Sequence, residues 1–212
     1  ETEQKLDALS YEEMLESIYR LAGEAKKSVA TVSRTSDEED WTDETTGIED
    51  SVTGIITADN GQELLIFASD EVCSGTKSWT VTFADSSRYT ASLKMRDRNR
   101  RLAVFSVPRR EISSATWSSL KVAVLGNSNL VQQGDPVIAL GNTFSYADGI
   151  GYGIISSTDY KETFYDGECD ILATDIAAAS DGSGVLFNME GEVVGLVMSS
   201  IWEDEESNTA NA

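Results

Sequence analysis

The stretch VLGNSNLVQQGDPVIALGNTF, residues 124–144, is the most informative segment for the fold, and it contains the short apolar run Pro136–Leu140. A short apolar run among turn residues is typical of a β-strand and too short for an average helix. Similar runs lie on both sides of it, at Ser28–Arg34, Gly54–Thr57, Leu64–Ala68, Leu102–Val107, Gly153–Ser157, Ile171–Thr174, Gly184–Phe187 and Val193–Met198. Many short strands at this spacing predict an all-β fold, built as a sandwich or as barrels.

Two turns support this strand pattern. The sequence ADNG at 58–61 separates two apolar runs, and Asn-Gly is a strong signal for a tight hairpin turn. Further on, Trp79, Val81 and Phe83 alternate with polar residues, ADSS at 84–87 turns the chain, and the alternation resumes at Tyr89. Alternation of this kind predicts a hairpin with one buried face and one solvated face.

Only the N-terminal segment has a helical period. Ser10 with Glu13 fits a capping box, and Leu9 with Met14 has the spacing of a hydrophobic staple, so we predict a helix that begins near Ser10. Its apolar stripe consists of Met14, Leu15, Ile18, Leu21, Ala22 and Ala25. Packing of this stripe against its own domain is the favoured interpretation. The alternatives are a helix that pairs with a partner and a stalk that leads to a membrane anchor.

Composition excludes several classes of protein. The 212 residues are enough for one domain with a sizeable core or for two small barrels that share one. A formal charge of −21 repels phosphate backbones, so we expect no nucleic-acid partner. No apolar run is long enough for a membrane span, so we expect a soluble chain with any anchor outside it.

The cysteines and the two acidic segments give weaker signals. Cys73 and Cys169 lack metal-ligand spacing and the chain has no histidine, so we expect no metal and no cofactor. The two thiols could form a disulfide or stay free.

The segments SDEEDWTDETTGIED at 36–50 and EDEES at 203–207 lack apolar periodicity, which favours a solvated loop and tail over a calcium or partner site.

A candidate nucleophile stands in AASDGSGVLF, residues 178–187. Gly182 and Gly184 flank Ser183, an arrangement that resembles the turn that presents a catalytic serine. In isolation, Gly-Ser-Gly is more often a tight entry into a strand. A serine hydroxyl is a poor nucleophile until a neighbouring base takes its proton, and this chain offers no histidine for that role.

Taken in order, the segments resemble the trypsin-like protease domain of the HtrA (DegP) family from about residue 28 to residue 200. Residues 124–144 resemble the entry into the family's second barrel. The other matching phrases are GIISS at 153–157, LATDIA at 172–177, GSG at 182–184 and NMEGEVVGLVM at 188–198. The resemblance implies a trypsin-like double six-stranded β-barrel that follows an N-terminal helix, with the active site between the barrels.

The same resemblance places two changed residues in the catalytic triad. In LLIFASDEV, residues 64–72, Asp70 falls at the position of the family's histidine, with Glu71 as the alternative if the register slips by one. Arg101, directly before LAV, falls at the position of the family's aspartate. An aspartate is a weak base at neutral pH, and an arginine never deprotonates in this role. We therefore expect Ser183 to be a vestigial nucleophile, and we expect Asp70 and Arg101 to form an ion pair less than about 6 Å apart.

The resemblance keeps the family's oxyanion-hole residues only in part. Gly182 and Gly184 are kept, but Asp181 stands two residues before the serine, where the family has glycine. A carboxylate beside an anion site is unfavourable. Without a triad, even an intact hole would support only weak hydrolysis.

We therefore interpret the chain as a catalytically inactive HtrA-like domain, a pseudoprotease that binds a peptide or protein by strand addition in its cleft. One alternative is a residual serine hydrolase that uses an unconventional base at Ser183. The other is a structural or sensory ectodomain whose surface carries the function. We expect four parts: an amphipathic helix at 1–27, a first barrel at 28–118, a second barrel at 119–201 and an acidic tail or linker at 202–212.

The family context adds expectations about the longer protein. The resemblance implies an extracytoplasmic location in the cell envelope or as a secreted protein, with a membrane anchor before this segment and a peptide-binding PDZ domain after it. An oligomer is also consistent with the family. The sequence does not identify the peptide or protein partner.

Overall fold

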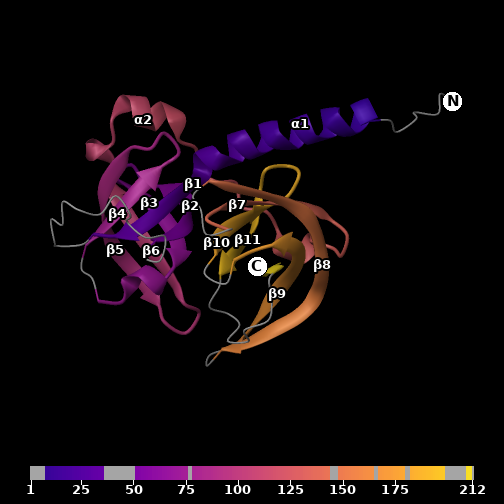
Figure 1. Ribbon diagram of the computed structural model, residues 1–212. Helices are drawn as coiled ribbons and strands as arrows, with labels where there is room; N and C mark the ends of the chain where they lie inside the picture. The colour runs from indigo at the N-terminus through magenta and orange to yellow at the C-terminus, as the bar shows by residue number, and fades with distance from the viewer. Residues whose placement is uncertain are drawn as a thin grey trace.

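The first half of the chain forms a closed six-stranded β-barrel in the computed structural model (Figure 1). The structure describes residues 8–35, 51–75, 78–143, 148–164, 167–179, 182–198 and 209–211. The barrel strands are β1 (Val29–Arg34), β2 (Ser51–Asp59), β3 (Glu63–Ser69), β4 (Trp79–Phe83), β5 (Arg88–Asp97) and β6 (Leu102–Pro108). All neighbours are antiparallel, in the order β1-β2-β3-β6-β5-β4, so β6 lies between β3 and β5.

The second half forms a six-stranded antiparallel sheet in the order β11-β10-β7-β8-β9-β12. Its strands are β7 (Pro136–Gly141), β8 (Gly149–Phe164), β9 (Gly167–Ala177), β10 (Ser183–Phe187), β11 (Val193–Met198) and β12 (Thr209–Asn211). Cα atoms of β12 lie within 8 Å of β11 as well as β9, so the two ends of the sheet approach each other as in a barrel. The predicted all-β, two-barrel fold is confirmed.

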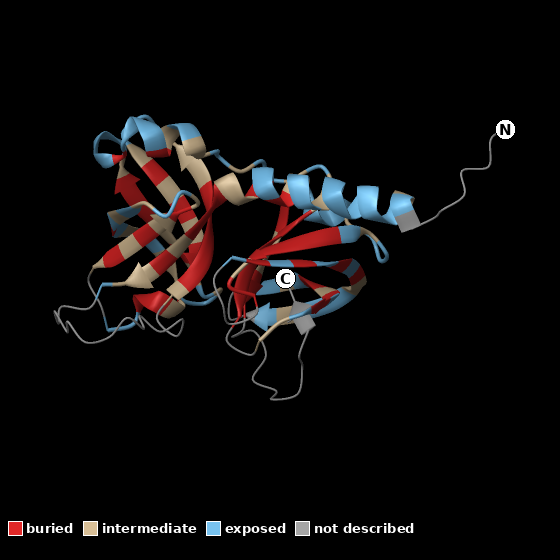
Figure 2. Cartoon of the chain, turned by 45° about the horizontal axis from the view of Figure 1, so that its top comes forward, coloured by how far each residue is buried: buried red, intermediate tan, exposed pale blue. Residues whose placement is uncertain are grey.

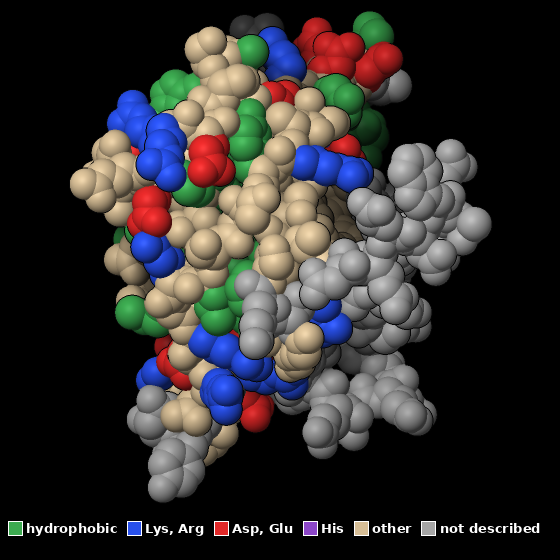
Figure 3. Space-filling model, turned by 90° about the vertical axis from the view of Figure 1, so that its left-hand side faces the viewer, with side chains coloured by type: hydrophobic (Ala, Val, Ile, Leu, Met, Phe, Trp, Pro, Cys, Tyr) green, Lys and Arg blue, Asp and Glu red, His purple; other side chains and the backbone are tan. Residues whose placement is uncertain are grey.

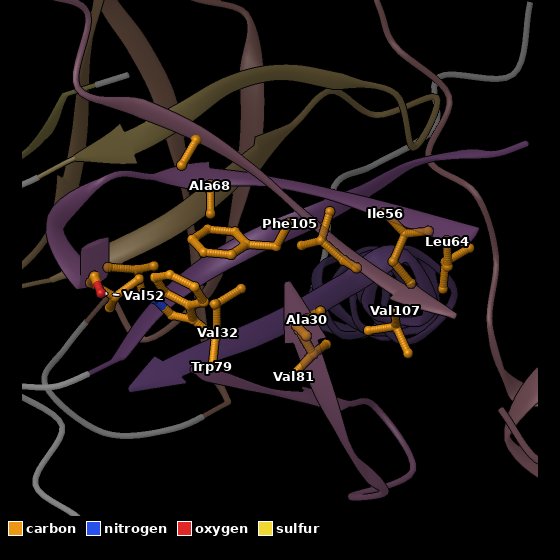
Figure 4. Packing of buried hydrophobic residues seen from close by; sticks show 14 of the residues in the cluster. Ala30, Val32, Val52, Ile56, Leu64, Ala68, Trp79, Val81, Phe105 and Val107 are labelled. Carbon is orange, nitrogen blue, oxygen red and sulfur yellow. Dashed lines mark hydrogen bonds between the residues drawn. The ribbon is translucent and has the colours of Figure 1, made fainter. Parts of the chain in front are cut away.

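Alternation along the strands produces the core of the first barrel. In β4, Trp79, Val81 and Phe83 point inward and are nearly inaccessible, while the threonines between them are less buried. Phe105 of β6 lies fully buried beside Trp79, with ring centroids 5.6 Å apart (Figure 4). The predicted Asn-Gly turn is present: Gly61 has φ +85°, and the Asn60 side chain accepts the backbone N–H of Glu63.

A separate apolar cluster joins the two halves. Val29 and Ile55 of the first barrel pack with Ile138 and Val185 of the second sheet and with Ala22 of helix α1 (Ala8–Ala25). Burial of such apolar surface contributes about 25 cal/mol per Å². The C-terminal part of the helix therefore belongs to the interface between the two halves. Short helical segments complete the fold: η1 (Lys26–Ser28), η3 (Glu71–Cys73), η4 (Arg109–Glu111), α2 (Ser114–Ser119) and η5 (Ser128–Leu130).

Only the C-terminal half of α1 packs on the body of the protein. Ile18, Leu21 and Ala22 join the interface cluster, whereas Leu9 and Tyr19 are more than two-thirds exposed and the N-terminal turns extend away from the barrels (Figure 2). The predicted start was wrong, because the helix already includes Ala8 and Leu9, and Ser10 lies inside it rather than at its cap. No helix within the described ranges is long and apolar enough to cross a bilayer.

The remaining expectations concern the two cysteines and the two acidic segments. Cys73, in the first barrel core, and Cys169, on β9, are both free thiols, so the disulfide is not formed. The acidic segment 36–50 and residues 203–207 lie outside the described residues. Strand β12, within the stretch expected to be an acidic tail or linker, is a short element that the sequence pattern did not predict.

Candidate functional site

Ser183 begins β10, and its hydroxyl points into the protein rather than toward solvent. The residue is 3% exposed. Its Oγ accepts the backbone N–H of Thr53 at 2.8 Å and donates to Thr53 Oγ1 at 3.2 Å. In return, Thr53 Oγ1 donates to the Ser183 carbonyl oxygen at 3.2 Å. Because Thr53 belongs to β2 and Ser183 to β10, these hydrogen bonds fasten the first barrel to the second sheet.

Two backbone N–H groups at Ser183 and Gly182 are also hydrogen-bonded. The Ser183 N–H donates to the carbonyl of Asn142 at 3.0 Å, and the Gly182 N–H donates to the carbonyl of Ala179 at 2.9 Å. The Asn142 N–H completes the network by donating to Thr53 Oγ1 at 3.0 Å. An oxyanion hole needs N–H groups that point toward a reacting carbonyl. Here the N–H of the serine itself is used inside the fold, and Asp181 lies outside the described residues.

Close backbone approach explains the two glycines beside Ser183. A Cβ at Gly182 would collide with the carbonyl oxygen of Thr143, and a Cβ at Gly184 would lie 3.0 Å from the carbonyl oxygen of Leu140. Both contacts are with backbone atoms, which cannot move aside as a flexible side chain can. The Gly-Ser-Gly sequence therefore has a packing role that requires no catalysis.

Asp70 occupies a second site, at the end of β3. Its side chain is 6% exposed, and Oδ2 accepts a hydrogen bond from Arg96 Nε at 2.7 Å. Arg101 Nε lies 3.8 Å from Oδ1, inside the 6 Å limit expected for this pair. The backbone also links the pair, because the Asp70 N–H donates to the Arg101 carbonyl at 2.8 Å while Arg101 has φ +56°.

Arg96 is the principal partner of Asp70, a contact that the sequence pattern does not predict. The strand order explains the contact: β6 lies between β3 and β5, and both Ser69 and Asp97 pair with Leu102. Asp70 directly follows Ser69, and Arg96 directly precedes Asp97. Both residues therefore lie close to Leu102, on opposite sides of β6. The available signal was the stretch RDRNRR at 96–101, which concentrates four arginines in a strongly acidic chain.

The two sites are built from different parts of the molecule. A hollow of about 650 Å³ opens on Asp70, and its lining residues come from two segments of the first barrel, 70–75 and 96–101. The hydrogen-bond partners described for Ser183 are instead Thr53 and Asn142. The alternative position, Glu71, lies in the same hollow as Asp70. No hydrogen bond within the described ranges links either carboxylate to Ser183.

A third feature is a cavity of about 580 Å³ between the two halves. It is lined mainly by apolar side chains from both barrels and from the segment that connects them. They include Ile55, Phe67, Leu102, Leu125, Leu196 and Met198. Leu196 and Met198 both belong to β11.

The chain is similar to proteins of a known family. The family described as "Trypsin-like peptidase domain" matches residues 52–196, a span that includes both Asp70 and Ser183. The chain belongs to the trypsin-like peptidase domain family. The resemblance to HtrA proteases is confirmed at the level of an HtrA-like trypsin-fold domain.

Curated relatives of this trypsin-like domain are longer proteins. It is 30% identical over 132 residues to "Probable periplasmic serine endoprotease DegP-like" of Pseudomonas savastanoi pv. phaseolicola, covering 62% of this chain and 26% of that protein. It is 29% identical over 150 residues to "Serine protease Do-like HtrB" of Bacillus subtilis, covering 68% and 31%. For "Magnetosome formation protease MamE" of Paramagnetospirillum magneticum the identity is 34% over 158 residues, covering 72% and 20%. The chain thus spans less than a third of the length of each of these relatives.

Family membership leaves the roles of individual residues open. The assignments of Asp70 to the histidine position, Arg101 to the aspartate position and Ser183 to the nucleophile remain predictions from the sequence. In the structure, the Asp70 side chain contacts Arg96, and the Ser183 hydroxyl is hydrogen-bonded to Thr53. In a working triad, the serine hydroxyl is hydrogen-bonded to a base instead.

Proposed function

We propose that this chain is a catalytically inactive HtrA-like domain that binds an extended segment of a peptide or protein. The observation that carries the proposal is the state of Ser183, whose hydroxyl and N–H are both used in buried hydrogen bonds to Thr53 and Asn142. A nucleophile must reach a substrate carbonyl, and its N–H must help hold the oxyanion. Ser183 would have to break its link between the barrels to do either.

The lack of a suitable base supports the same conclusion. The chain has no histidine, and Asp70 is held by Arg96 and Arg101. Two lysines also have carboxylate partners: Lys94 Nζ lies 2.8 Å from Glu63, and Lys161 Nζ lies 3.5 Å from Asp170. No hydrogen bond within the described ranges links either lysine to Ser183.

Cys73 does not offer an alternative nucleophile. Burial raises the pKa of its thiol above the ordinary value, although the nearby Arg96 opposes this shift. The reactive form of cysteine is the thiolate. A thiol with a raised pKa is therefore mostly protonated at neutral pH and reacts slowly.

The cavity between the barrels supports a binding role. Cavities of several hundred Å³ with largely apolar walls and a few polar groups are typical of ligand sites in proteins. This one combines Phe67 of the first barrel, Leu125 of the connection and Leu196 of β11. Apolar side chains of an extended peptide would fill it, and the family fold would add main-chain pairing along a strand.

We extend the proposal to location. Relatives from Pseudomonas savastanoi and Chlamydia trachomatis carry the description periplasmic in their names. An extracytoplasmic location for this chain is consistent with those names. A membrane anchor, a PDZ domain and an oligomeric state remain parts of the same proposal for the longer protein.

The inactive state predicts the outcome of labelling with a fluorophosphonate probe. We expect no labelling of the purified chain at neutral pH, because the Ser183 hydroxyl is buried and lacks a base. The measurement is intact-protein mass spectrometry, with Ser183→Ala as the control. Labelling that increases with pH and disappears in Ser183→Ala would support the residual hydrolase instead.

The binding role predicts a difference between two matched leucines. Leu125 is 60% exposed and lines the cavity between the barrels, whereas Leu130 is 73% exposed and lies outside it. We expect Leu125→Glu to weaken binding of a fluorescein-labelled, leucine- and valine-rich peptide by about tenfold, equal to about 1.4 kcal/mol. Leu130→Glu should leave affinity nearly unchanged.

Fluorescence anisotropy measures both affinities, and the two leucines are exposed enough for the variants to fold. Equal affinities of the two variants would favour a structural or sensory ectodomain whose surface carries the function.

A further inference from the structure

We propose that the arginine-lined hollow on Asp70 is a binding site for the carboxylates of an acidic peptide segment of a partner protein. The hollow has a volume of about 650 Å³ and lies entirely on the first barrel, apart from the cavity between the barrels. It is lined by Arg96, Arg98 and Arg101, with Asp70 and Glu71 as the acidic residues. Positive groups thus outnumber negative ones at this position in a chain of net charge −21.

The guanidinium groups retain donors for a ligand. Asp70 accepts a hydrogen bond from Arg96 Nε, and Arg101 Nε lies 3.8 Å from its carboxylate. Their Nη groups form no hydrogen bond to any residue that the structure describes, and the same holds for the Arg98 side chain. A guanidinium carries five N–H donors in a planar fork that matches a carboxylate. The hollow therefore presents several forks with unused donors to an incoming anion.

Asp70 prepares the site instead of blocking it. Its carboxylate is nearly buried and close to two arginines, so its charge is compensated within the barrel. The contact at 2.7 Å also fixes the direction of the Arg96 side chain. At the adjacent turn, Asp97 accepts the N–H groups of Asn99 and Arg100, which holds the chain between Arg96 and Arg101. A preorganised site loses less conformational entropy when a ligand binds.

The acidic surface of the rest of the chain does not cancel this local attraction. At physiological ionic strength the Debye length is about 8 Å, so charges on distant parts of the protein are largely screened. A carboxylate close to a guanidinium is attracted more strongly near a protein surface than in bulk water, because the effective dielectric constant is lower there. Basic side chains gather on the lower part of the first-barrel face in Figure 3. A short acidic segment can contact this region without covering the acidic remainder, whereas an extended nucleic acid could not.

Arg98 and Arg110 provide a matched pair for the test. Both are exposed and neither forms an ion pair within the described ranges, but only Arg98 lines the hollow. The probe is a fluorescein-labelled hexaglutamate peptide, and fluorescence anisotropy measures its affinity at low and at physiological salt. We expect saturable binding by the wild-type chain and a loss of about tenfold, or about 1.4 kcal/mol, in Arg98→Glu. Arg110→Glu makes the same change of charge and should cost less than about twofold.

Three results would overturn the proposal: no saturable binding by the wild-type chain, an equal loss in the two arginine variants, or full competition by inorganic phosphate at the concentration of the peptide. Leu125→Glu, which tests the cavity between the barrels, should leave hexaglutamate binding unchanged. Failure of the anion site is therefore distinguishable from failure of the proposed peptide cleft.

Discussion

Gly141→Ala is expected to lower the free energy of unfolding by about 3 to 5 kcal/mol. Gly141 has φ +124°, a conformation that residues with a side chain rarely adopt, and an added Cβ would lie 2.5 Å from both Cγ2 and Oγ1 of Thr53. Because Thr53 holds Ser183 and Asn142, any shift that relieves the collision also disturbs the hydrogen bonds between the barrels. Urea unfolding followed by tryptophan fluorescence measures the loss.

Gly134→Ala separates backbone strain from the collision. Gly134 also has a positive φ, +93°, but a Cβ there would meet nothing within 4 Å. We expect this variant to lose only about 1 kcal/mol, from strain alone. An equal loss in the free energy of unfolding of the two variants would contradict this prediction, because it would show that the close contact of Gly141 with Thr53 adds nothing to the effect of backbone strain.

Asp70→Ala is expected to cost about 2 to 4 kcal/mol of stability. Removal of the carboxylate leaves Arg96, whose side chain is only 23% exposed, without its acceptor at 2.7 Å. A fully buried pair would lose somewhat more, but Arg96 can turn partly toward water. Urea unfolding of Asp70→Ala, Arg96→Ala and the double variant gives the coupling energy between the two residues.

Arg101→Ala is the control for this cycle. Its side chain is 46% exposed and its Nε lies 3.8 Å from Asp70, so its loss should cost less than about 1 kcal/mol. An Arg101→Ala loss as large as that of Arg96→Ala would contradict the view that the shorter contact dominates the site.

The strands and tight turns were predictable because they depend on neighbours in the sequence. Trp79, Val81 and Phe83 alternate with threonines, and this period alone orients them toward a core. Asn60 and Gly61 form their turn from local hydrogen bonds and a positive φ. The start of α1 was less predictable, because Ala8 and Leu9 continue the helix past a plausible cap at Ser10. Strand β12 was missed because three residues carry no readable period.

The candidate site likewise has features that the sequence determines and features that only the folded structure determines. The absence of histidine is a property of the amino-acid chain and requires no coordinates, since no fold can supply an imidazole that is not encoded. The inward hydrogen bonds of Ser183 join residues 130 positions apart, and the contact of Asp70 with Arg96 joins residues 26 positions apart. These contacts depend on strand order, on register and on how one barrel packs against the other. Local sequence patterns do not encode such long-range pairings, so they became visible only once the chain was folded.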